Sequence, residues 1–239
     1  MDKSKAVIAL SGGMDSTTLL YWAVDTYSEV LAISFDYGQN HIKEIEFAKW
    51  HCKNLNIPHE IIEIPFLSKI SKSSLTGGAD EIPEGMYDAD NMKSTVVPFR
   101  NGIILAILGA YAEANNCQFI AYGAHAGDHA IYPDCRKEFV DDMSAAISNG
   151  TYTETIIETP FVKLTKSELL TFGSSGDIDY SKTWSCYKGK ERPCLKCGTC
   201  VERTEAFLDN KLKDPLLTNG EWKEAVDNYA RFKYESTKD

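Results

Sequence analysis

The sequence predicts an α/β protein: a doubly wound parallel sheet followed by a helical C-terminal part that carries four clustered cysteines. Three observations support this prediction. Short β-branched runs alternate with helical patterns through the first two thirds of the 239 residues, which is typical of a parallel sheet with helices on both faces. A Ser-Gly-Gly turn follows the first apolar run, and four of the seven cysteines lie between residues 186 and 200.

The first three predicted strands alternate with two predicted helices. The strands span residues 6–10, 30–35 and 59–64, and the helices span residues 17–27 and 41–55. The second helix is amphipathic, and its expected buried face consists of Ile42, Ile45, Ala48 and Leu55. Because ligands of doubly wound sheets bind beyond the carboxyl ends of the strands, we expect the site there.

Further along the chain the alternation continues and then gives way to helices. Residues 103–114 are apolar on nearly all sides and predict a buried helix, and the next predicted strands are residues 118–122 and 153–157. Helices are predicted at residues 166–172, 201–208 and 221–232. The change of pattern suggests a domain of residues 1–165 followed by a helical region of residues 166–239.

The connection between residues 67 and 98 has little periodicity. Connections of this length are usually lids, binding loops or disordered segments. We expect it to close over the site when ligands bind, and an ordered contact between the subunits of a dimer is the alternative.

Composition restricts the class of protein. The 26.7 kDa chain has 35 acidic and 25 basic residues, a formal net charge of −10, which disfavours stable nucleic-acid binding and anionic membrane surfaces. The longest apolar run, residues 102–112, is shorter than the roughly 20 residues of a membrane span. The N-terminus does not resemble a signal peptide. These features predict a cytoplasmic protein with no membrane partner, and for its cysteines they favour metal binding over disulfides.

The segment Ser11-Gly12-Gly13-Met14-Asp15-Ser16-Thr17 lies between a predicted buried strand and a predicted helix. Two glycines allow a tight turn, and backbone N–H groups at a helix N-terminus bind phosphate oxygens. The hydroxyl groups add donors, and Asp15 can hold a magnesium ion. The alternative is a glycine turn in which Asp15 or Ser16 only caps the helix. The segment lacks the lysine of the kinase-type P-loop and the spacing of the dinucleotide-binding motif.

Cys186, Cys194, Cys197 and Cys200 are separated by seven, two and two residues. This spacing allows four thiolates to surround one tetrahedral ion, which favours a structural zinc. An iron–sulfur cluster and a redox disulfide between Cys194 and Cys197 are the alternatives.

Three further polar segments follow predicted strands or precede the buried helix, namely residues 36–41, 97–101 and 123–136. They place acids, arginines and aromatic side chains where the site of an α/β protein belongs. Asp128 or Asp134 could bind paired N–H donors of a heterocycle. Arg100 or Arg136 could neutralise a carboxylate or a phosphate.

The ordered motifs SGGxDS, YGQxH, VPxRN, YPDCR and SCY…PCxxCxxC, over about residues 6–208, resemble the 7-cyano-7-deazaguanine synthase family of the queuosine pathway. That family belongs to the PP-loop ATP pyrophosphatases, whose fold is adenine nucleotide alpha hydrolase-like. The resemblance implies a homodimer with structural Zn²⁺ that uses ATP with Mg²⁺. It also implies a carbon–nitrogen ligase that converts 7-carboxy-7-deazaguanine and ammonia to the nitrile, by adenylating first the carboxylate and then the amide.

With this resemblance, the candidate residues fall into four groups. The catalytic candidates are Asp15, Ser16, Arg100 and Asp128. The ATP-binding candidates are Leu10, Ser11, Gly12, Gly13, Met14, Asp15, Ser16, Thr17, Thr18, Leu19 and Leu20. The substrate-binding candidates are Tyr37, Gln39, His41, Arg100, Asn101, Asp128, Tyr132, Asp134 and Arg136. The zinc candidates are Cys186, Cys194, Cys197 and Cys200.

Residues 128–131 depart from the small, glycine-containing stretch that precedes Tyr-Pro-Asp in better-known members of the family, and the residues between the cysteines differ as well. These differences leave open a paralogue that modifies a related deazapurine, a tRNA or another macromolecule. A zinc-ribbon interaction module with an inactive loop is a further alternative, which the intact SGGxDS motif disfavours.

Overall fold

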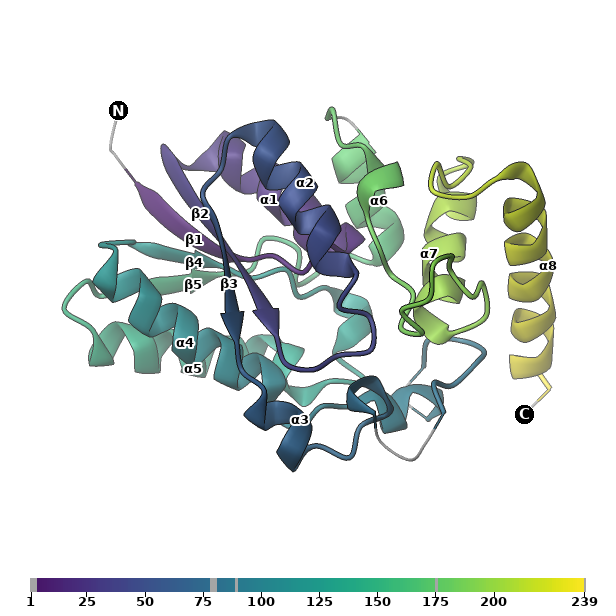
Figure 1. Cartoon of the computed structure of the whole chain (residues 1–239), viewed down its shortest axis with the longest axis horizontal. Helices are drawn as coiled ribbons and strands as arrows, with labels where there is room; N and C mark the ends of the chain where they lie inside the picture. The colour runs from purple at the N-terminus through teal and green to yellow at the C-terminus, as the bar shows by residue number, and fades with distance from the viewer. Residues whose placement is uncertain (1–3, 78–80, 89, 175, 239) are drawn as a thin grey trace.

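The computed structural model describes residues 4–77, 81–88, 90–174 and 176–238, and within them five parallel strands form one sheet in the order β3-β2-β1-β4-β5 (Figure 1). The strands are β1 (Lys5–Ala9), β2 (Glu29–Asp36), β3 (His59–Glu63), β4 (Phe119–Ala121) and β5 (Ile156–Glu158). This order confirms the predicted doubly wound α/β fold.

Helices cover both faces of the sheet (Figure 1). The helices α1 (Met14–Thr26) and α2 (Glu44–Leu55) lie on one face, and α4 (Arg100–Ala114) and α5 (Lys137–Gly150) lie on the other. Successive side chains of a strand point to opposite faces, so Ala6 and Ile8 of β1 join the core beneath α1, whereas Val7 joins the core beneath α4. Burial on both faces explains why this strand is a continuous apolar run.

The chain order of the strands reverses between β1 and β4. The helices that follow these two strands therefore lie on opposite faces of the sheet, and the loops after β1 and β4 separate at their carboxyl ends. A crevice at this position is the usual ligand site of a doubly wound sheet.

Some predicted boundaries were wrong. Helix α2 begins at Glu44 and not at residue 41, because residues 41–43 form a turn in which the Glu44 N–H donates to the His41 carbonyl at 2.9 Å. Ile42 lies on this turn and is 41% exposed, so its assignment to the buried face was wrong, whereas Ile45 and Ala48 are buried.

Helix α5 has no counterpart among the predicted elements. Val140 and Ile147 are buried, and the partly buried Phe139 and Met143 pack against the same core. These apolar residues recur at helical spacing, so the sequence does contain the signal for this helix and the prediction missed it.

Helix α4 begins at Arg100, three residues earlier than predicted, and β5 begins at Ile156, three residues later. Polar residues lie near the starts of α4 and β5, so a prediction based on hydrophobic periodicity misplaces these two boundaries.

The described part of the connection between β3 and α4 is packed. It contains α3 (Phe66–Ile70) and two 3₁₀ turns, Ser74–Thr76 and Asn91–Thr95. Leu67, Leu75 and Met92 are completely buried in the core beneath α4. Weak periodicity therefore does not mean absence of packing here, and closure of the segment over the site stays a prediction.

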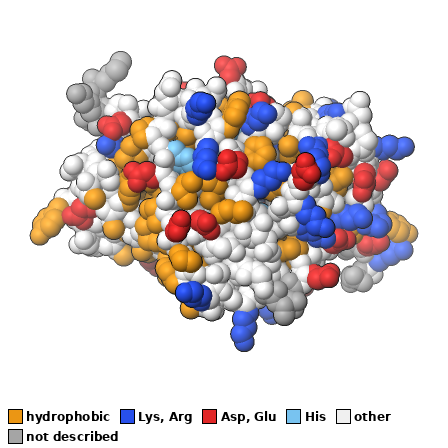
Figure 2. Space-filling view, viewed as in Figure 1, with side chains coloured by type: hydrophobic (Ala, Val, Ile, Leu, Met, Phe, Trp, Pro, Cys, Tyr) orange, Lys and Arg blue, Asp and Glu red, His pale blue; other side chains and the backbone are white. Residues whose placement is uncertain are grey.

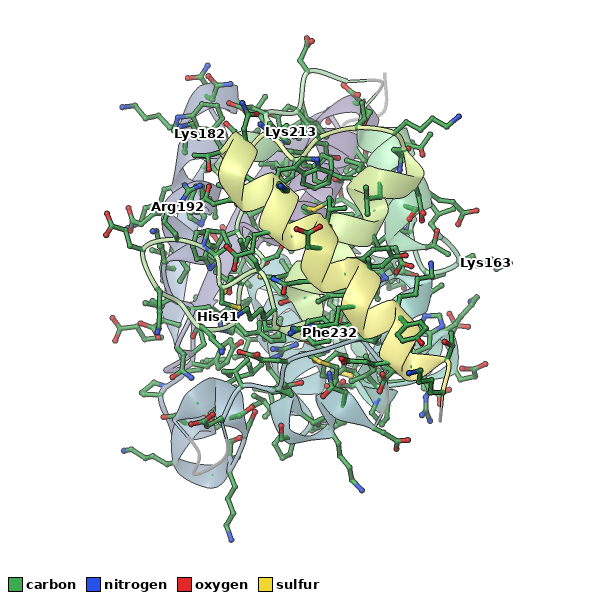
Figure 3. All side chains as sticks on the ribbon, turned by 90° about the vertical axis from the view of Figure 1, so that its right-hand side faces the viewer. His41, Lys163, Lys182, Arg192, Lys213 and Phe232 are labelled. Carbon is green, nitrogen blue, oxygen red and sulfur yellow. The ribbon has the colours of Figure 1, made fainter. Side chains whose placement is uncertain are left out.

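The C-terminal part is helical, as predicted, with α6 (Lys166–Ser174), α7 (Gly198–Asp209) and α8 (Asn219–Ser236). Thr218 and Glu221 form a capping box at the start of α8. Helix α8 lies across the outer side of this end of the molecule, where Arg192 pairs with Glu221 (Figure 3). Across the described ranges, no helix has both the length and the apolar composition needed to span a membrane.

A buried ion pair joins α7 to the loop that follows it, and hydrogen bonds from the same arginine reach the linker in front of the cysteines. The Arg203 Nε atom donates to Asp214 at 2.6 Å, Nη1 donates to Thr183 at 2.8 Å, and Nη2 donates to the Tyr180 carbonyl at 3.0 Å. The side chains of Arg203 and Asp214 are 5% and 2% exposed. Because a buried charge without its partner is costly, removal of either side of this pair should destabilise the fold.

We expect Asp214→Asn to lower the free energy of unfolding by about 3–5 kcal/mol, because it leaves the Arg203 guanidinium buried without a counter-charge. Urea denaturation measures the change. The matched control is Asp141→Asn, which removes an ion pair with Lys137 whose side chains are 60% and 50% exposed, and it should cost below about 1 kcal/mol. Equal stabilities of the two variants would contradict this assignment.

Candidate functional site

A cavity of about 220 Å³ lies at the carboxyl ends of β1, β2 and β4. Its walls come from the loops after these strands, the start of α4, and the linker that contains Trp184, Ser185 and Tyr187. Tyr87 enters from the connection between β3 and α4, and Lys166 enters from the start of α6. The cavity therefore occupies the crevice expected of a doubly wound sheet.

The loop after β1 approaches α2 so closely that a side chain at Gly12 is excluded. Gly12 has a φ of +95°, and a Cβ atom there would lie 2.0 Å from the Glu44 carbonyl oxygen. The Ser11 and Gly12 N–H groups both donate to Ser16 Oγ at 3.2 Å, and the Gly13 N–H donates to Ser11 Oγ at 3.2 Å. These three bonds are at the long end of the normal range for N–H···O hydrogen bonds. Three backbone N–H groups of the loop therefore make only weak hydrogen bonds, to the Ser11 and Ser16 hydroxyl groups.

The interpretation of Asp15 or Ser16 as the helix N-cap was wrong. Helix α1 begins at Met14, and its N-cap is Gly13, which has no side-chain cap. Asp15 is instead in the first turn, where its carboxylate faces other charged groups.

The predicted ATP-binding segment is divided between the cavity wall and the core. Lining residues of the cavity include Leu10, Ser11, Gly13, Met14, Asp15 and Ser16. Completely buried behind them are Thr17, Thr18, Leu19 and Leu20. The division runs along the helix: the first turn of α1 borders the cavity, whereas in the next turn Leu19 and Leu20 pack in the core and the Thr18 hydroxyl bonds to the Tyr180 hydroxyl at 2.8 Å.

Asp15 belongs to a network of charges that no sequence motif indicated. Lys166 Nζ lies 3.2 Å from Asp15 Oδ2 and 2.6 Å from Glu202 Oε2. His125 Nε2 lies 3.7 Å from Asp15 Oδ2 and 3.5 Å from Asp128 Oδ2. The network joins α1, α6, α7 and the loop after β4, so it exists only in the folded chain.

Burial and neighbouring charges act in opposite directions on this network. Burial alone would raise the pKa of Asp15, but Lys166 and His125 lower it overall, so Asp15 is ionised. Burial alone would lower the pKa of Lys166, but Asp15 and Glu202 raise it, so Lys166 stays charged. Asp15 Oδ1 is buried without a hydrogen-bond partner among the described residues. A free carboxylate oxygen beside a polar loop is a suitable ligand for a hard cation such as Mg²⁺.

Aromatic rings and one arginine form the opposite wall. Arg100 Nη1 donates to the Tyr37 hydroxyl at 3.1 Å, and its guanidinium lies 5.5 Å from the centre of the Tyr37 ring. The His41 ring packs against Tyr187 with centroids 5.1 Å apart. These residues come from the loop after β2, the start of α4 and the C-terminal linker, so this wall also depends on the tertiary fold.

The structure brings most of the predicted substrate-binding residues to the cavity. Its lining includes Tyr37, His41, Arg100, Asn101, Asp128 and Tyr132. Outside the described lining lie Gln39, Asp134 and Arg136.

Each of the three residues outside the lining has a local contact that accounts for its position. The Gln39 amide group donates to the Phe35 carbonyl at 3.0 Å and thereby shapes the turn after β2. Asp134 accepts from the Asn101 N–H at 2.9 Å at the start of α4. Arg136 is exposed and donates to the His129 carbonyl at 3.0 Å.

The four cysteines of the C-terminal part come together, and their Sγ atoms all lie within 4.8 Å of one another. Cys200 Sγ lies 3.5 Å from Cys197 Sγ and 4.0 Å from Cys194 Sγ. Four thiolates around one tetrahedral ion at metal–sulfur distances of about 2.3 Å would be about 3.8 Å apart. The cluster could therefore hold a single metal ion.

The cysteine cluster is connected to the cavity wall. Cys186 follows Trp184 and Ser185 in the linker, and the backbone N–H of Trp184 donates to the Gly12 carbonyl at 2.9 Å. Thr199, between Cys197 and Cys200, donates to the Ser185 carbonyl at 2.8 Å and also lines the cavity. The cluster thus supports the segment that contacts the loop after β1.

Known proteins resemble this chain in sequence over most of its length. The chain is 50% identical over 212 residues to 7-cyano-7-deazaguanine synthase of Caldicellulosiruptor saccharolyticus, covering 89% of this chain and 94% of that protein. It is 49% identical to the enzyme of the same name from Methanoregula boonei, covering 89% and 98%. Among solved structures, an NH3-dependent NAD synthetase from Campylobacter jejuni aligns with 99% of this chain and 88% of its own, at 16% identity and a TM-score of 0.47.

The family model described as queuosine biosynthesis protein QueC matches residues 5–211. This range contains the loop after β1, the charged network, the aromatic wall and all four clustered cysteines. The chain therefore belongs to the queuosine biosynthesis protein QueC family.

Proposed function

We propose that this protein converts 7-carboxy-7-deazaguanine, ammonia and ATP to 7-cyano-7-deazaguanine, and so acts as a carbon–nitrogen ligase. The observation that carries the proposal is the 50% identity to a 7-cyano-7-deazaguanine synthase over 94% of that enzyme. The cavity supports it, because a phosphate-binding type of loop and an arginine face the same space.

In this proposal the loop after β1 binds the phosphates of ATP. The N–H groups of Ser11, Gly12 and Gly13 would exchange their 3.2 Å bonds to hydroxyl groups for shorter bonds to charged phosphate oxygens. Asp15 would hold Mg²⁺ through its unpartnered Oδ1 atom. When bound, the ion supplies charge stabilisation to the departing pyrophosphate. Lys166, 3.2 Å from Asp15, adds a fixed positive charge to this end of the cavity.

The substrate carboxylate needs activation, because its oxygen is a poor leaving group. Arg100 lines the cavity and stays protonated, so it would hold the carboxylate near the α-phosphate of ATP. Adenylation makes AMP the leaving group, and attack by ammonia then gives the amide. A second adenylation, at the amide oxygen, permits loss of that oxygen and formation of the nitrile.

The Cys186, Cys194, Cys197 and Cys200 cluster is proposed to bind Zn²⁺ in a structural role. Four thiolate ligands close the coordination shell, as in structural zinc sites, and leave no position for substrate. An iron–sulfur cluster fits less well, because several iron atoms would hold the sulfur atoms farther apart than the 3.5 and 4.0 Å observed for Cys200.

We also propose that the chain forms a homodimer. Ile61, Phe66 and Ile70 follow one another along the edge strand β3 and α3, and they are 40%, 47% and 64% exposed. Figure 2 shows hydrophobic side chains gathered on the face that carries β3. Exposed apolar patches of this kind are typical of protein–protein contacts.

Purified protein incubated with ATP, MgCl2, ammonium chloride and 7-carboxy-7-deazaguanine tests the function. We expect the nitrile and AMP, each dependent on all four components, as measured by liquid chromatography with mass spectrometry. Light scattering on the same preparation should give twice the 26.7 kDa chain mass. Turnover of a related deazapurine or of unmodified tRNA, with no nitrile formed from this acid, would replace the proposal with a paralogous activity.

A further inference from the structure

We propose that the Glu44 carboxylate is the general base that accepts the proton ammonium must lose before its nitrogen can attack the acyl adenylate. This inference rests on the proposed function and adds a catalytic residue to it. Glu44 belongs to none of the groups of residues predicted from sequence.

The position of Glu44 is suited to this role. It is the first residue of α2, its side chain is 12% exposed, and it lines the cavity. Its backbone carbonyl packs against Gly12 of the phosphate-binding type of loop. The same cavity exposes Arg100, which we assign to the substrate carboxylate. Glu44 therefore lines the same cavity as the loop proposed to bind ATP and the arginine proposed to bind the substrate carboxylate.

The groups that face Glu44 leave it without a strong ionic partner. His41 Nε2 lies 3.6 Å from Glu44 Oε1, which is too long for a hydrogen bond. Among the described residues, this is the only ion-pair contact of the Glu44 carboxyl group. Arg100, at the start of α4, directs Nη1 to the Tyr37 hydroxyl. Tyr37 and Tyr187, from the loop after β2 and the C-terminal linker, complete the surroundings.

These surroundings allow Glu44 to exchange a proton near neutral pH. Burial raises the pKa of Glu44 to about 8, although Arg100 and Gln39 act in the opposite direction. Burial and Arg100 lower the pKa of His41 to about 3, so His41 (Figure 3) is neutral and cannot replace Glu44 as a proton acceptor from ammonium at the same pH. A general base is most effective when its pKa is near the working pH.

One proton passes from ammonium to the Glu44 carboxylate, which leaves ammonia with a free electron pair. That pair forms the C–N bond to the acyl carbon, and the bond between the acyl carbon and the AMP oxygen breaks. A second proton leaves the nitrogen with the AMP phosphate, so the products are the neutral amide, AMP and protonated Glu44.

Glu44→Gln separates this role from binding when two nucleophiles are compared. Ammonium must be deprotonated, whereas hydroxylamine is already a neutral nucleophile at pH 7.5 and traps the adenylate as a hydroxamate. We expect product formation from ammonium to fall about 100-fold or more, whereas the first-turnover burst of pyrophosphate and the formation of hydroxamate should stay within about threefold of the parent. The ratio of parent to variant rate with ammonium should rise with pH toward about 8, because the parent carboxyl ionises there.

The matched control is Glu46→Gln, which makes the same change on the exposed side of α2, where Glu46 pairs with Lys49 at 2.7 Å. It should keep the parent rates with both nucleophiles. If the Glu44→Gln variant loses equal activity with ammonium and hydroxylamine, or loses activity with neither, the proposed role of Glu44 is overturned and the proposed function is unaffected. Absence of nitrile from the parent protein overturns the proposed function, and the role of Glu44 with it.

Discussion

Replacing Asp15 with asparagine is expected to lower ATP-dependent turnover by about 100-fold or more and to leave the fold intact. Asparagine keeps the shape of the side chain but offers a neutral oxygen in place of the buried, unpartnered Oδ1. A magnesium ion supplies several kcal/mol of charge stabilisation, and about 1.4 kcal/mol corresponds to a tenfold change in rate. Lys166 keeps its 2.6 Å ion pair with Glu202, so the substitution does not leave that charge unpaired.

Pyrophosphate release measured across a magnesium titration checks this expectation, and circular dichroism checks the fold. Turnover of the variant should need more magnesium and remain low at saturation. The matched control is Asp25→Asn, which makes the same change at the exposed far end of α1 and should behave as the parent does. A rate for Asp15→Asn within twofold of the parent would show that the phosphates and the metal bind elsewhere.

Replacing Cys197 with alanine is expected to abolish metal binding and to unfold much of the C-terminal part. The parent protein should contain one zinc per chain. Structural zinc in small domains contributes about 10–16 kcal/mol of binding free energy, which appears as folding free energy. Cys197 is completely buried and its carbonyl group accepts the Val201 N–H in the first turn of α7 at 3.0 Å, so loss of the ion should reach that helix first.

Elemental analysis and limited proteolysis measure the two effects. In the linker before the cysteines, the Trp184 backbone N–H donates a hydrogen bond to the Gly12 carbonyl of the loop after β1. Loss of the metal should disturb this contact, so ATP turnover should fall together with the metal content. The matched control is Cys52→Ala, the same substitution at a buried cysteine of α2, which should retain the metal. Iron in the parent protein, or full zinc content in Cys197→Ala, would contradict the assignment.

The sequence predicted those parts of the site that are contained in short segments. Ser11, Gly12 and Gly13 are adjacent, and a strand before them and a helix after them are enough to specify the turn. Cys194, Cys197 and Cys200 lie within one turn and the start of a helix, so their spacing already indicates a common ligand. In both cases the distances between the groups depend on only a few backbone dihedral angles.

Lys166, Glu202, His125 and Glu44 could not be predicted in this way. Lys166 is an ordinary residue at the start of a helix until the fold places it 3.2 Å from Asp15, 151 positions earlier in the chain. Glu44 carries no motif of its own, and its raised pKa arises from burial that only the assembled cavity produces. Long-range contacts and desolvation are properties of the packed chain and not of a segment.

By itself, the sequence determined the doubly wound sheet, the glycine turn after β1, the clustering of the cysteines and the family. These depend on local hydrophobic period, backbone freedom and residue spacing, which are readable along the chain. Only the tertiary structure decided that Asp134 binds the start of α4, outside the lining of the cavity, and that Asp15 belongs to a charged network. It decided this because side-chain direction and electrostatic environment are set by the elements that pack together, whatever their separation in sequence.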